Sequence, residues 1–363
     1  MITHFRLEDF KGHRDTKLAF EQFTMLVGDN GSGKTSVLEA LYLQMAASRD
    51  LEVFRSHNLA PEDLCRRGSK GVFRLSSTSV IRQQQWDLEL AIHRPDTSWM
   101  ASISGHGPDG RFSADAYLGN EYNESSLNPG GDWETVHSAT SVVELYGFEP
   151  AKIAASAYSD HPDTPVREDG AQTAVALAAL KLGDDEAFDR IEAAMRELVP
   201  SLERIRIKPA EVVRPARNDT VIGSKLFFDF RGSPGIPAHH ASHGTLIVLA
   251  LLTVLHGREH RPDLILLDDF DHALHPRAQM EVVRMIKGLL ALDELKETQI
   301  IATTHSPYVL DELAPKNVIA FALRDDGTVA SKSLSEHPDA PKVNGALKSG
   351  ELWSLDAERD WVL

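Results

Sequence analysis

Hydrophobic patterning near the start of the chain predicts a strand, a glycine-rich loop and a helix. The apolar run Phe23–Val27 is typical of a buried parallel strand. It leads directly into the segment Gly28–Thr35, and the helical periodicity of Val37–Leu43 follows. A strand, a glycine-rich loop and a helix in this order are typical of a phosphate-binding unit.

The last part of the chain alternates helical and strand patterns. The ranges Thr245–Leu255 and Gln279–Leu292 predict helices, and Leu264–Leu267 and Gln299–Thr303 predict strands. Such alternation is typical of a parallel sheet with covering helices, so the expected fold class is α/β.

The middle of the chain has a different pattern. Residues 72–118 are strand-like, with clear alternation at Leu88–Ile92. The segment Tyr117–Asp132, rich in Gly, Asn, Ser and Pro, predicts a long surface loop. Two helices are predicted at Thr173–Lys181 and Asp184–Leu198, the second with acids at its start and Pro200 after its end.

A predicted strand after these helices has one basic face. In Leu202–Lys208, isoleucines alternate with Arg204, Arg206 and Lys208. The simplest interpretation of this face is a solvated sheet surface. A polar, proline-containing stretch near residues 160–170 predicts a boundary, and we expect three lobes at 1–160, 161–238 and 239–363.

Composition narrows the class of protein. The 363 residues include 38 Lys and Arg against 54 Asp and Glu, a formal net charge of −16. This charge argues against a protein covered with basic surface for gripping DNA, although a local basic patch stays open. The single cysteine, Cys65, excludes an intrachain disulfide and a Cys-based zinc finger. With no secretory signal and no apolar stretch long enough for a bilayer, we expect a cytoplasmic protein.

The segment Gly28–Thr35 satisfies the pattern G-x-x-x-x-G-K-[ST]. Its backbone amides can surround a β-phosphate because glycines let the loop fold closely around an anion. Lys34 is placed to bridge the β- and γ-phosphates, and the Thr35 hydroxyl to ligate Mg²⁺. These residues predict bound ATP and Mg²⁺.

The strand Leu264–Leu267 ends in two acids, as a Walker B element does. A buried strand brings such acids to the sheet edge where doubly wound folds bind ligands. We expect Asp268 to hold the Mg²⁺ shell and Asp269 to polarise the attacking water. Runs of apolar residues before acids are common at strand ends, so this hypothesis depends on the glycine-rich loop.

Two further positions are candidates for contact with a γ-phosphate. Ser242 and Gly244 open an apolar helix. Ser242 taken alone is a simple helix N-cap; the functional hypothesis is that both residues meet ATP bound to another subunit. His305 ends the strand Gln299–Thr303, where an imidazole can hydrogen-bond a γ-phosphate.

Other histidines and the cysteine do not form a predicted site. The group His239, His240 and His243 has no acidic or cysteine partner at ligand spacing. His256 and His260 are four residues apart at a helix end, and nothing completes a nucleophile–base pair with Cys65. We expect none of them to bind metal or react.

Together these motifs resemble those of the ABC-type ATPases of the SMC, RecF and OLD group. Gly28–Thr35 is similar to the G-x-N-G-x-G-K-[ST] form of their P-loop, and Ser242–Leu246 to their signature. Asp268–Asp271 with Leu274-His275-Pro276 resembles their D-E-P-E…L-H-P stretch, and Thr303–Pro307 their T-H-S-P switch. The likeness extends to stand-alone OLD-like ATPases of the AAA family (AAA_21-like) found in antiphage defence.

The resemblance implies an ABC-ATPase head: a mixed, largely parallel P-loop sheet with an antiparallel β subdomain and a helical subdomain. It implies catalytic roles for Lys34, Asp269 and His305, and Mg²⁺ ligation by Thr35 and Asp268. The ATP-binding residues that it implies are Gly28, Asp29, Asn30, Gly31, Ser32, Gly33, Lys34, Thr35, Ser36, Ser242 and Gly244.

Three departures from the family pattern stand out. The expected catalytic glutamate is Asp269, whose carboxylate is set back by about 1.5 Å because it lacks one methylene. Phe270 stands where a proline is expected. No Q-loop glutamine can be placed, since residues 83–85 lie in strand-like sequence.

By resemblance the protein is an ATPase that dimerises around two ATP molecules and controls a separate effector, such as a nuclease, in nucleic-acid surveillance or antiphage defence. The alternatives are a RecF- or SMC-like repair ATPase and a poorly hydrolysing regulatory scaffold. The residues after His305 are few and lack spaced carboxylates for two-metal cleavage, so we expect no nuclease in this chain. Direct contact with nucleic acid stays open, and no membrane is expected.

Overall fold

The computed structural model describes residues 1–50, 53–56, 60–69, 71–94, 98–108, 110–118, 133–161, 164–214, 219–257, 261–343 and 346–363. The chain divides into two compact units, neither of which is continuous in sequence. The first consists of Met1–Leu145, Pro262–Asp268 and Leu292–Leu363, and the second of Tyr146–Arg261 and Asp269–Ala291.

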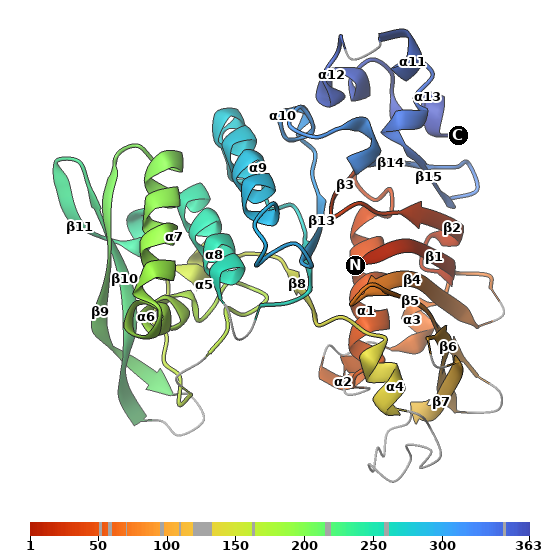
Figure 1. Cartoon of the computed structure of the whole chain (residues 1–363), viewed down its shortest axis with the longest axis horizontal. Coiled ribbons are helices and arrows are strands. Elements are labelled where there is room, and N and C mark those ends of the chain that lie inside the picture. Colours follow the sequence, from red (N-terminus) through yellow and green to blue (C-terminus); the bar gives the residue numbers. More distant parts are fainter. Residues whose placement is uncertain are drawn as a thin grey trace. The chain divides into compact units, whose positions relative to one another are not determined.

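A mixed six-stranded sheet organises the first unit, in the order β15-β14-β3-β13-β12-β8 (Figure 1). Four of its strands are parallel neighbours, and β15 runs antiparallel to β14. Every residue of β3, β12 and β13 is buried, which explains their uninterrupted apolar sequences. The bounds are β3 Phe23–Gly28, β8 Val143–Tyr146, β12 Leu264–Leu267, β13 Gln299–Thr303, β14 Val318–Leu323 and β15 Val329–Ser333.

An antiparallel six-stranded sheet in the order β2-β1-β4-β5-β6-β7 belongs to the same unit. Its strands alternate buried and exposed residues, as expected for a sheet with one solvated face. The strands are β1 Ile2–Phe10, β2 His13–Ala19, β4 Phe73–Ile81, β5 Gln84–His93, β6 Trp99–Gly107 and β7 Gly110–Leu118.

Helix α1 (Lys34–Ala47) connects the glycine-rich loop to the core of this unit. The buried Gln44 donates its amide to the carbonyl oxygens of Leu75 and Leu88, at 2.8 and 2.9 Å, which fixes the helix against β4 and β5. The shorter helices of the unit are α2 Val53–Ser56, α3 Pro61–Leu64, α4 Trp133–Ser138, α10 Pro307–Leu310, η3 Pro315–Asn317, η4 Leu334–Glu336, α11 Ala340–Val343, α12 Ser349–Trp353 and α13 Glu358–Val362.

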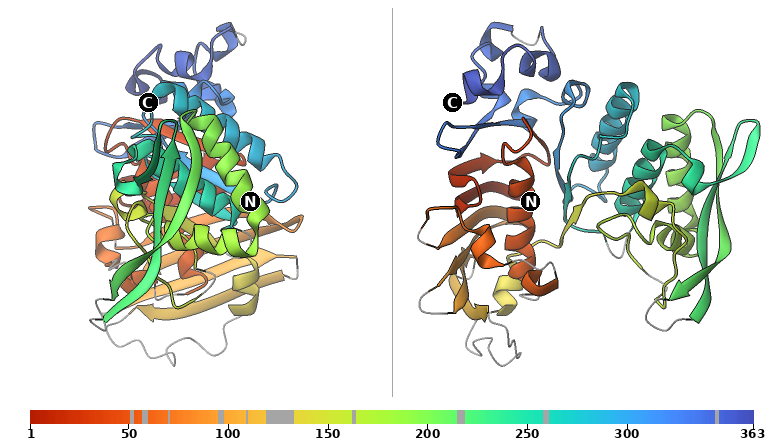
Figure 2. Two further views of the ribbon diagram at one scale, coloured as in Figure 1. Left: turned by 90° about the vertical axis from the view of Figure 1, so that its left-hand side faces the viewer. Right: turned by 180° about the vertical axis from the view of Figure 1, so that it is seen from behind.

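The second unit packs helices against a three-stranded antiparallel sheet in the order β11-β10-β9 (Figures 1 and 2). Helix α8 is buried along nearly its whole length, with α6 and α7 packed against it. The elements are α5 Pro150–Ile153, α6 Thr173–Gly183, α7 Asp185–Leu198, β9 Leu202–Arg214, β10 Asp219–Phe230, β11 Ser233–Pro237, η2 Ala238–His240, α8 His243–His256 and α9 Pro276–Leu290.

The structure confirms the predicted α/β class and the strand–loop–helix unit, with differences at element ends. Helix α9 begins at Pro276 rather than Gln279, because His275 caps its first turn and Pro276 takes the first helical position. The strands β10, β11, β14 and β15 carry no assignment in the sequence analysis. Most of the predicted loop Tyr117–Asp132 lies outside the described residues.

None of the helices in the described part of the chain is both long and apolar enough to cross a membrane.

Candidate functional site

Three segments meet at the carboxyl edge of the parallel strands of the first unit. The glycine-rich loop follows β3, Asp268 follows β12, and Thr304 and His305 follow β13. Parallel pairing of β3 with β13 and of β13 with β12 brings these ends together. The sequence analysis placed candidate residues in all three segments.

The loop after β3 depends on glycine at its two ends. Gly28 and Gly33 have φ values of 139° and 101°, which residues with a side chain rarely adopt. A Cβ on Gly28 would lie 2.3 Å from the Phe321 carbonyl oxygen, and one on Gly33 would lie 2.8 Å from Val329 Cγ2. The loop can therefore approach β14 and β15 only without side chains at these positions.

Lys34 lies inside the loop that precedes it. Its side chain is buried, and Nζ donates to the carbonyl oxygens of Gly28 at 2.8 Å and Asp29 at 2.9 Å. The neighbouring Ser32 Oγ is also buried and has no hydrogen-bond partner among the described residues. A buried ammonium beside an unsatisfied hydroxyl is the polar environment that a phosphate group would complete.

Asp268 lies between the loop and β13. Its carboxylate accepts hydrogen bonds from Thr35 Oγ1, at 3.2 and 3.3 Å, and from Thr303 Oγ1 at 2.7 Å. A hydroxyl and a carboxylate at this spacing are the hard oxygen ligands that Mg²⁺ prefers. The residues present therefore fit a magnesium ion held by Thr35 and Asp268.

His13 supports the loop from β2, and the sequence analysis missed it. The ring is completely buried, with Nε2 3.2 Å from the Gly33 carbonyl oxygen and Nδ1 3.0 Å from Thr16 Oγ1. Desolvation lowers the pKa of His13 to about 4, against a smaller raising effect of the Gly33 hydrogen bond. In sequence, Lys11-Gly12-His13 indicates only a turn, so no local signal marks this residue.

The segment after β13 is fixed by its backbone. The Thr304 amide donates to the Leu26 carbonyl oxygen at 3.2 Å, and the Ser306 amide to Thr304 Oγ1 at 3.0 Å. His305, between them, is exposed at the same sheet edge. The loop residues Asp29, Asn30, Gly31 and Thr35 are exposed as well, whereas Ser36 is half-buried.

The remaining predicted site residues belong to the second unit. Ser242 caps α8, since its Oγ accepts from the Thr245 amide at 3.2 Å. A Cβ on Gly244 would lie 2.7 Å from Leu274 Cδ2 and 3.1 Å from the Ala273 carbonyl oxygen, so a side chain there would make the segment before α9 shift. The structural interpretation of Ser242 thus holds, and its exposed position leaves the phosphate hypothesis open.

Asp269 is exposed and has a left-handed backbone with a φ of 45°. Aspartate is among the few residue types that tolerate this conformation. Phe270, in place of the expected proline, is buried in the second unit. The buried Asp271 is held by Gln279, whose Nε2 lies 3.1 Å from the Asp271 carbonyl oxygen.

His256 and Cys65, two of the remaining histidine and cysteine candidates, lie among the described residues. His256 Nδ1 lies 2.9 Å from the Leu252 carbonyl oxygen within its own helix, and His260 lies outside the described residues. Burial raises the pKa of Cys65, which opposes thiolate reactivity.

One cluster of potential metal ligands, unforeseen in the sequence, occurs among the described residues: His337, Asp339 and Asp356. Lys342 already pairs with Asp339 at 2.6 Å, and His337 Nδ1 accepts from the Asp339 amide at 3.2 Å. That hydrogen bond puts the ring proton on Nε2, which faces Asp356 at 3.6 Å. A metal would have to displace this proton.

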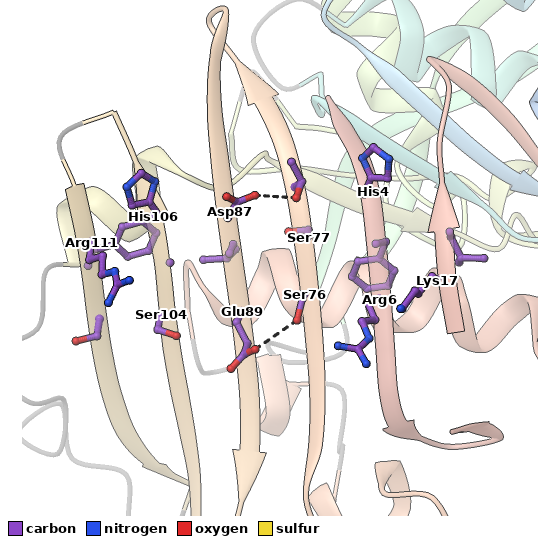
Figure 3. Close-up of a pocket in the computed structure, with 17 residues that line it drawn as sticks. His4, Arg6, Lys17, Ser76, Ser77, Asp87, Glu89, Ser104, His106 and Arg111 are labelled. Carbon is purple, nitrogen blue, oxygen red and sulfur yellow. Dashed lines mark hydrogen bonds between the residues drawn. The ribbon is translucent and has the colours of Figure 1, made fainter. Parts of the chain in front are cut away.

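A hollow of about 860 Å³ lies over the solvated face of the antiparallel sheet (Figure 3). Asp87 accepts from Thr78 Oγ1 at 2.7 Å, and Ser76 Oγ lies 3.5 Å from Glu89. Arg6, Lys17 and Arg111 bring the opposite charge to the same surface. Acidic and basic side chains are interspersed on this surface, so it favours neither an anionic nor a cationic ligand.

Comparison with known proteins places the site in context. Residues 23–311 match the family described as "AAA domain, putative AbiEii toxin, Type IV TA system". The Septu protein PtuA of Bacillus thuringiensis is 38% identical over 71 residues, which are 20% of this chain and 17% of that protein. The DNA replication and repair protein RecF of Enterobacter sp. (strain 638) is 34% identical over 107 residues, 28% of this chain and 30% of RecF. The chain thus covers less than a third of either relative.

Two solved structures have a similar fold. The SmcHead bound to the C-winged helix domain of ScpA superposes with a TM-score of 0.58 at 19% identity, covering 92% of this chain and 98% of that one. The Smc head domain with an extended coiled coil, bound to the C-terminal domain of ScpA derived from Pyrococcus furiosus, gives 0.53 at 17% identity, with 95% and 98% covered. At this identity the likeness concerns the fold alone.

Proposed function

Because this chain belongs to the AAA_21 family and is an ABC-type ATPase of the SMC, RecF and OLD group, we propose that it hydrolyses ATP as a homodimer and thereby controls a separate effector protein. The observation that carries the proposal is the assembly of the glycine-rich loop, Asp268 and the segment after β13 at one sheet edge. In such folds ligands bind at the carboxyl ends of the strands.

The triphosphate is held by the loop Gly28–Thr35 and by Ser36 at the start of α1. Amides of Asp29, Asn30, Gly31, Ser32 and Gly33 are the donors for the β-phosphate. Lys34 exchanges its carbonyl partners for phosphate oxygens when ATP binds, because an ammonium bonds a charged acceptor more strongly than a neutral one.

Thr35 and Asp268 would hold Mg²⁺ beside the phosphates. An ion held there would supply Lewis-acid stabilisation of the charge on the phosphate groups. Thr303 orients the Asp268 carboxylate through its 2.7 Å hydrogen bond.

Asp269 orients the attacking water and accepts its proton. The water oxygen bonds to the γ-phosphorus, the bond from that phosphorus to the bridging oxygen breaks, and ADP and phosphate leave. His305 donates a hydrogen bond to the γ-phosphate and so distinguishes ATP from ADP. Its exposure at the sheet edge supports this role.

Each chain has one P-loop and one signature segment. We assign Ser242 and Gly244 to the γ-phosphate of ATP bound by a second copy, so that ATP joins two chains and hydrolysis releases them. The effector is a separate protein, a nuclease by preference, in nucleic-acid surveillance or antiphage defence. The similarity to PtuA and RecF supports this role, and ATP as substrate favours the cytoplasm.

A second candidate function has its own support. The short side chain of Asp269 favours slow hydrolysis, as in an ATP-dependent scaffold that regulates a partner, because its carboxylate is set back from the attacking water. A repair ATPase like RecF or SMC is the other alternative, supported by the RecF similarity.

Phosphate release by purified full-length protein tests hydrolysis. Lys34→Ala should reduce turnover at least about a hundredfold, because the β- and γ-phosphates lose their cation. Lys316→Ala is the matched control, since this exposed lysine pairs with Glu21 at 3.0 Å away from the loop. Nucleotide binding with no turnover in the wild type would favour the scaffold, and equal turnover in Lys34→Ala would refute the site.

A further inference from the structure

The basic face predicted for Leu202–Lys208 lies on β9 and continues onto the neighbouring antiparallel strand β10. In β9, Arg204, Arg206 and Lys208 alternate with Ile205 and Ile207. The inward positions are apolar: Ile205 and its neighbour Phe228 on β10 are fully buried, where α6 and α7 pack against the sheet. The basic residues therefore face away from these helices.

Register places three β10 residues on the same outward face. Lys225 lies opposite Lys208, Phe227 opposite Arg206, and Asp229 opposite Arg204. Directly opposite residues in an antiparallel pair point to the same side of the sheet. Figure 2, left, shows β9 and β10 in front of the helices of their unit.

Phe227 lies at the centre of this face, half-buried and surrounded by cations. Lys208 Nζ lies 4.4 Å from the centre of the Phe227 ring, and Lys225 Nζ lies 5.9 Å from it. The ring is thus presented outward between two ammonium groups rather than packed into the core.

Little negative charge balances these cations. Asp229 is the one carboxylate among the six outward positions, and it is occupied by Arg206 Nε at 2.6 Å and the Gly235 amide at 2.8 Å. Arg204 lies opposite the buried Asp229, and its charge, after the Arg206 hydrogen bond, helps to lower the pKa of that carboxyl. Lys208 and Lys225, by contrast, lie opposite each other and are placed to act on an external anion. The exposed His239 follows β11 nearby, and its pKa is lowered by desolvation and by the charges of His240 and Lys225.

This concentration of positive charge contrasts with the net charge of −16 of the whole chain. A local basic face on an acidic protein is the kind of surface that attracts a polyanionic ligand, whereas a solvated sheet surface is the simpler interpretation that the experiment below tests. The aromatic ring at its centre adds a surface on which a base can stack. A flat sheet that presents an aromatic ring among cations is a known way to bind unpaired bases and their phosphates.

We propose that the outward face of β9 and β10 binds single-stranded nucleic acid, with a base stacked on Phe227 and phosphates on Lys208 and Lys225. The inference deepens the nucleic-acid role proposed above but depends on none of the ATP-site residues. Duplex ligands are disfavoured, since their bases are already stacked.

Fluorescence anisotropy of labelled oligo-dT and oligo-U of roughly 20 nucleotides, without ATP, tests this with the full-length chain. Lys208→Gln combined with Lys225→Gln should weaken binding and lower the slope of log K against log salt by about 1.4, for two fewer phosphate contacts. Phe227→Ala should weaken binding roughly tenfold, and Phe227→Tyr should retain it.

Lys181→Gln is the matched control, because Nζ of Lys181 on α6 lies 4.4 Å from the centre of the Phe188 ring on α7 and so forms the same kind of pair elsewhere in the unit. Unchanged melting temperatures show that the variants fold. Preference for one oligonucleotide identifies DNA or RNA. The proposal is refuted if the wild type binds neither, if the double variant keeps its affinity and salt slope, or if Lys181→Gln loses as much. Tighter binding of a duplex, unaffected by Phe227→Ala, refutes the single-strand assignment.

Phosphate release measured on the same variants separates the two proposals. The Gln variants should keep basal ATP turnover, and Lys34→Ala should keep oligonucleotide binding. Each proposal can therefore fail alone.

Discussion

His13 shows how a single buried side chain can support the glycine-rich loop without any motif. It is neutral because burial lowers its pKa to about 4, and its ring lies between Gly33 and Thr16. In the unfolded chain a histidine titrates near 6.5. The folded protein therefore binds fewer protons than the unfolded chain between these pH values, and its stability falls as pH decreases through this window.

We expect wild-type protein to lose about 3 kcal/mol of unfolding free energy through His13 between pH 7 and pH 4. His13→Gln should remove this part of the pH dependence, whatever it does to stability at pH 7. Urea denaturation across the window measures the difference, and the exposed His4→Gln is the control. A slope in His13→Gln equal to that of the wild type would contradict the assignment.

Asp269 is a second residue for which the structure adds what the sequence does not show, here its backbone conformation. A motif comparison shows only that a glutamate is missing, whereas the structure adds a φ of 45° that aspartate tolerates better than glutamate. Side-chain length and backbone conformation thus bear on the same position.

At the scale of elements, the sequence predicts what local pattern determines. The buried strands, the loop and helices α6, α7 and α8 all follow from apolar periodicity or glycine spacing. The pairing of strands is not predictable in this way. β14 pairs with β3 although about 290 residues separate them, and no local pattern in either strand indicates that partner. The division into lobes at 1–160, 161–238 and 239–363 stays a prediction. The two compact units are each built from segments far apart in sequence, and no local pattern indicates which segments join.

The start of α8 allows capping and phosphate contact to be separated. Ser242 caps the helix through the Thr245 amide, and Asp or Asn can do the same. We expect both Ser242→Asp and Ser242→Asn to keep the melting temperature within a few degrees. Only Ser242→Asp should abolish ATP turnover, because its charge repels the γ-phosphate. Equal turnover in the two variants, measured by phosphate release, would leave Ser242 as a cap alone.

At the scale of the whole molecule, the proposal requires two chains for each pair of active sites. One P-loop and one signature occur in each chain, and Ser242 can contact a γ-phosphate in trans only when a second copy is present. In the proposed dimer each triphosphate would neutralise Lys34 of one chain and face the α8 N-terminus of the other, so that bound ATP would hold the two copies together. Slow hydrolysis should lengthen the lifetime of the pair.

We therefore expect Asp269→Asn with ATP and Mg²⁺ to sediment as a dimer, and without nucleotide as a monomer. Replacing the carboxylate stops water activation while the binding residues stay intact. Adding Ser242→Arg should prevent the dimer, because a bulky cation obstructs the interface, yet leave Lys34-dependent ATP binding measurable by fluorescent nucleotide. A dimer that ignores nucleotide, and persists with Ser242→Arg, would mean that another surface joins the chains and that ATP does not control assembly.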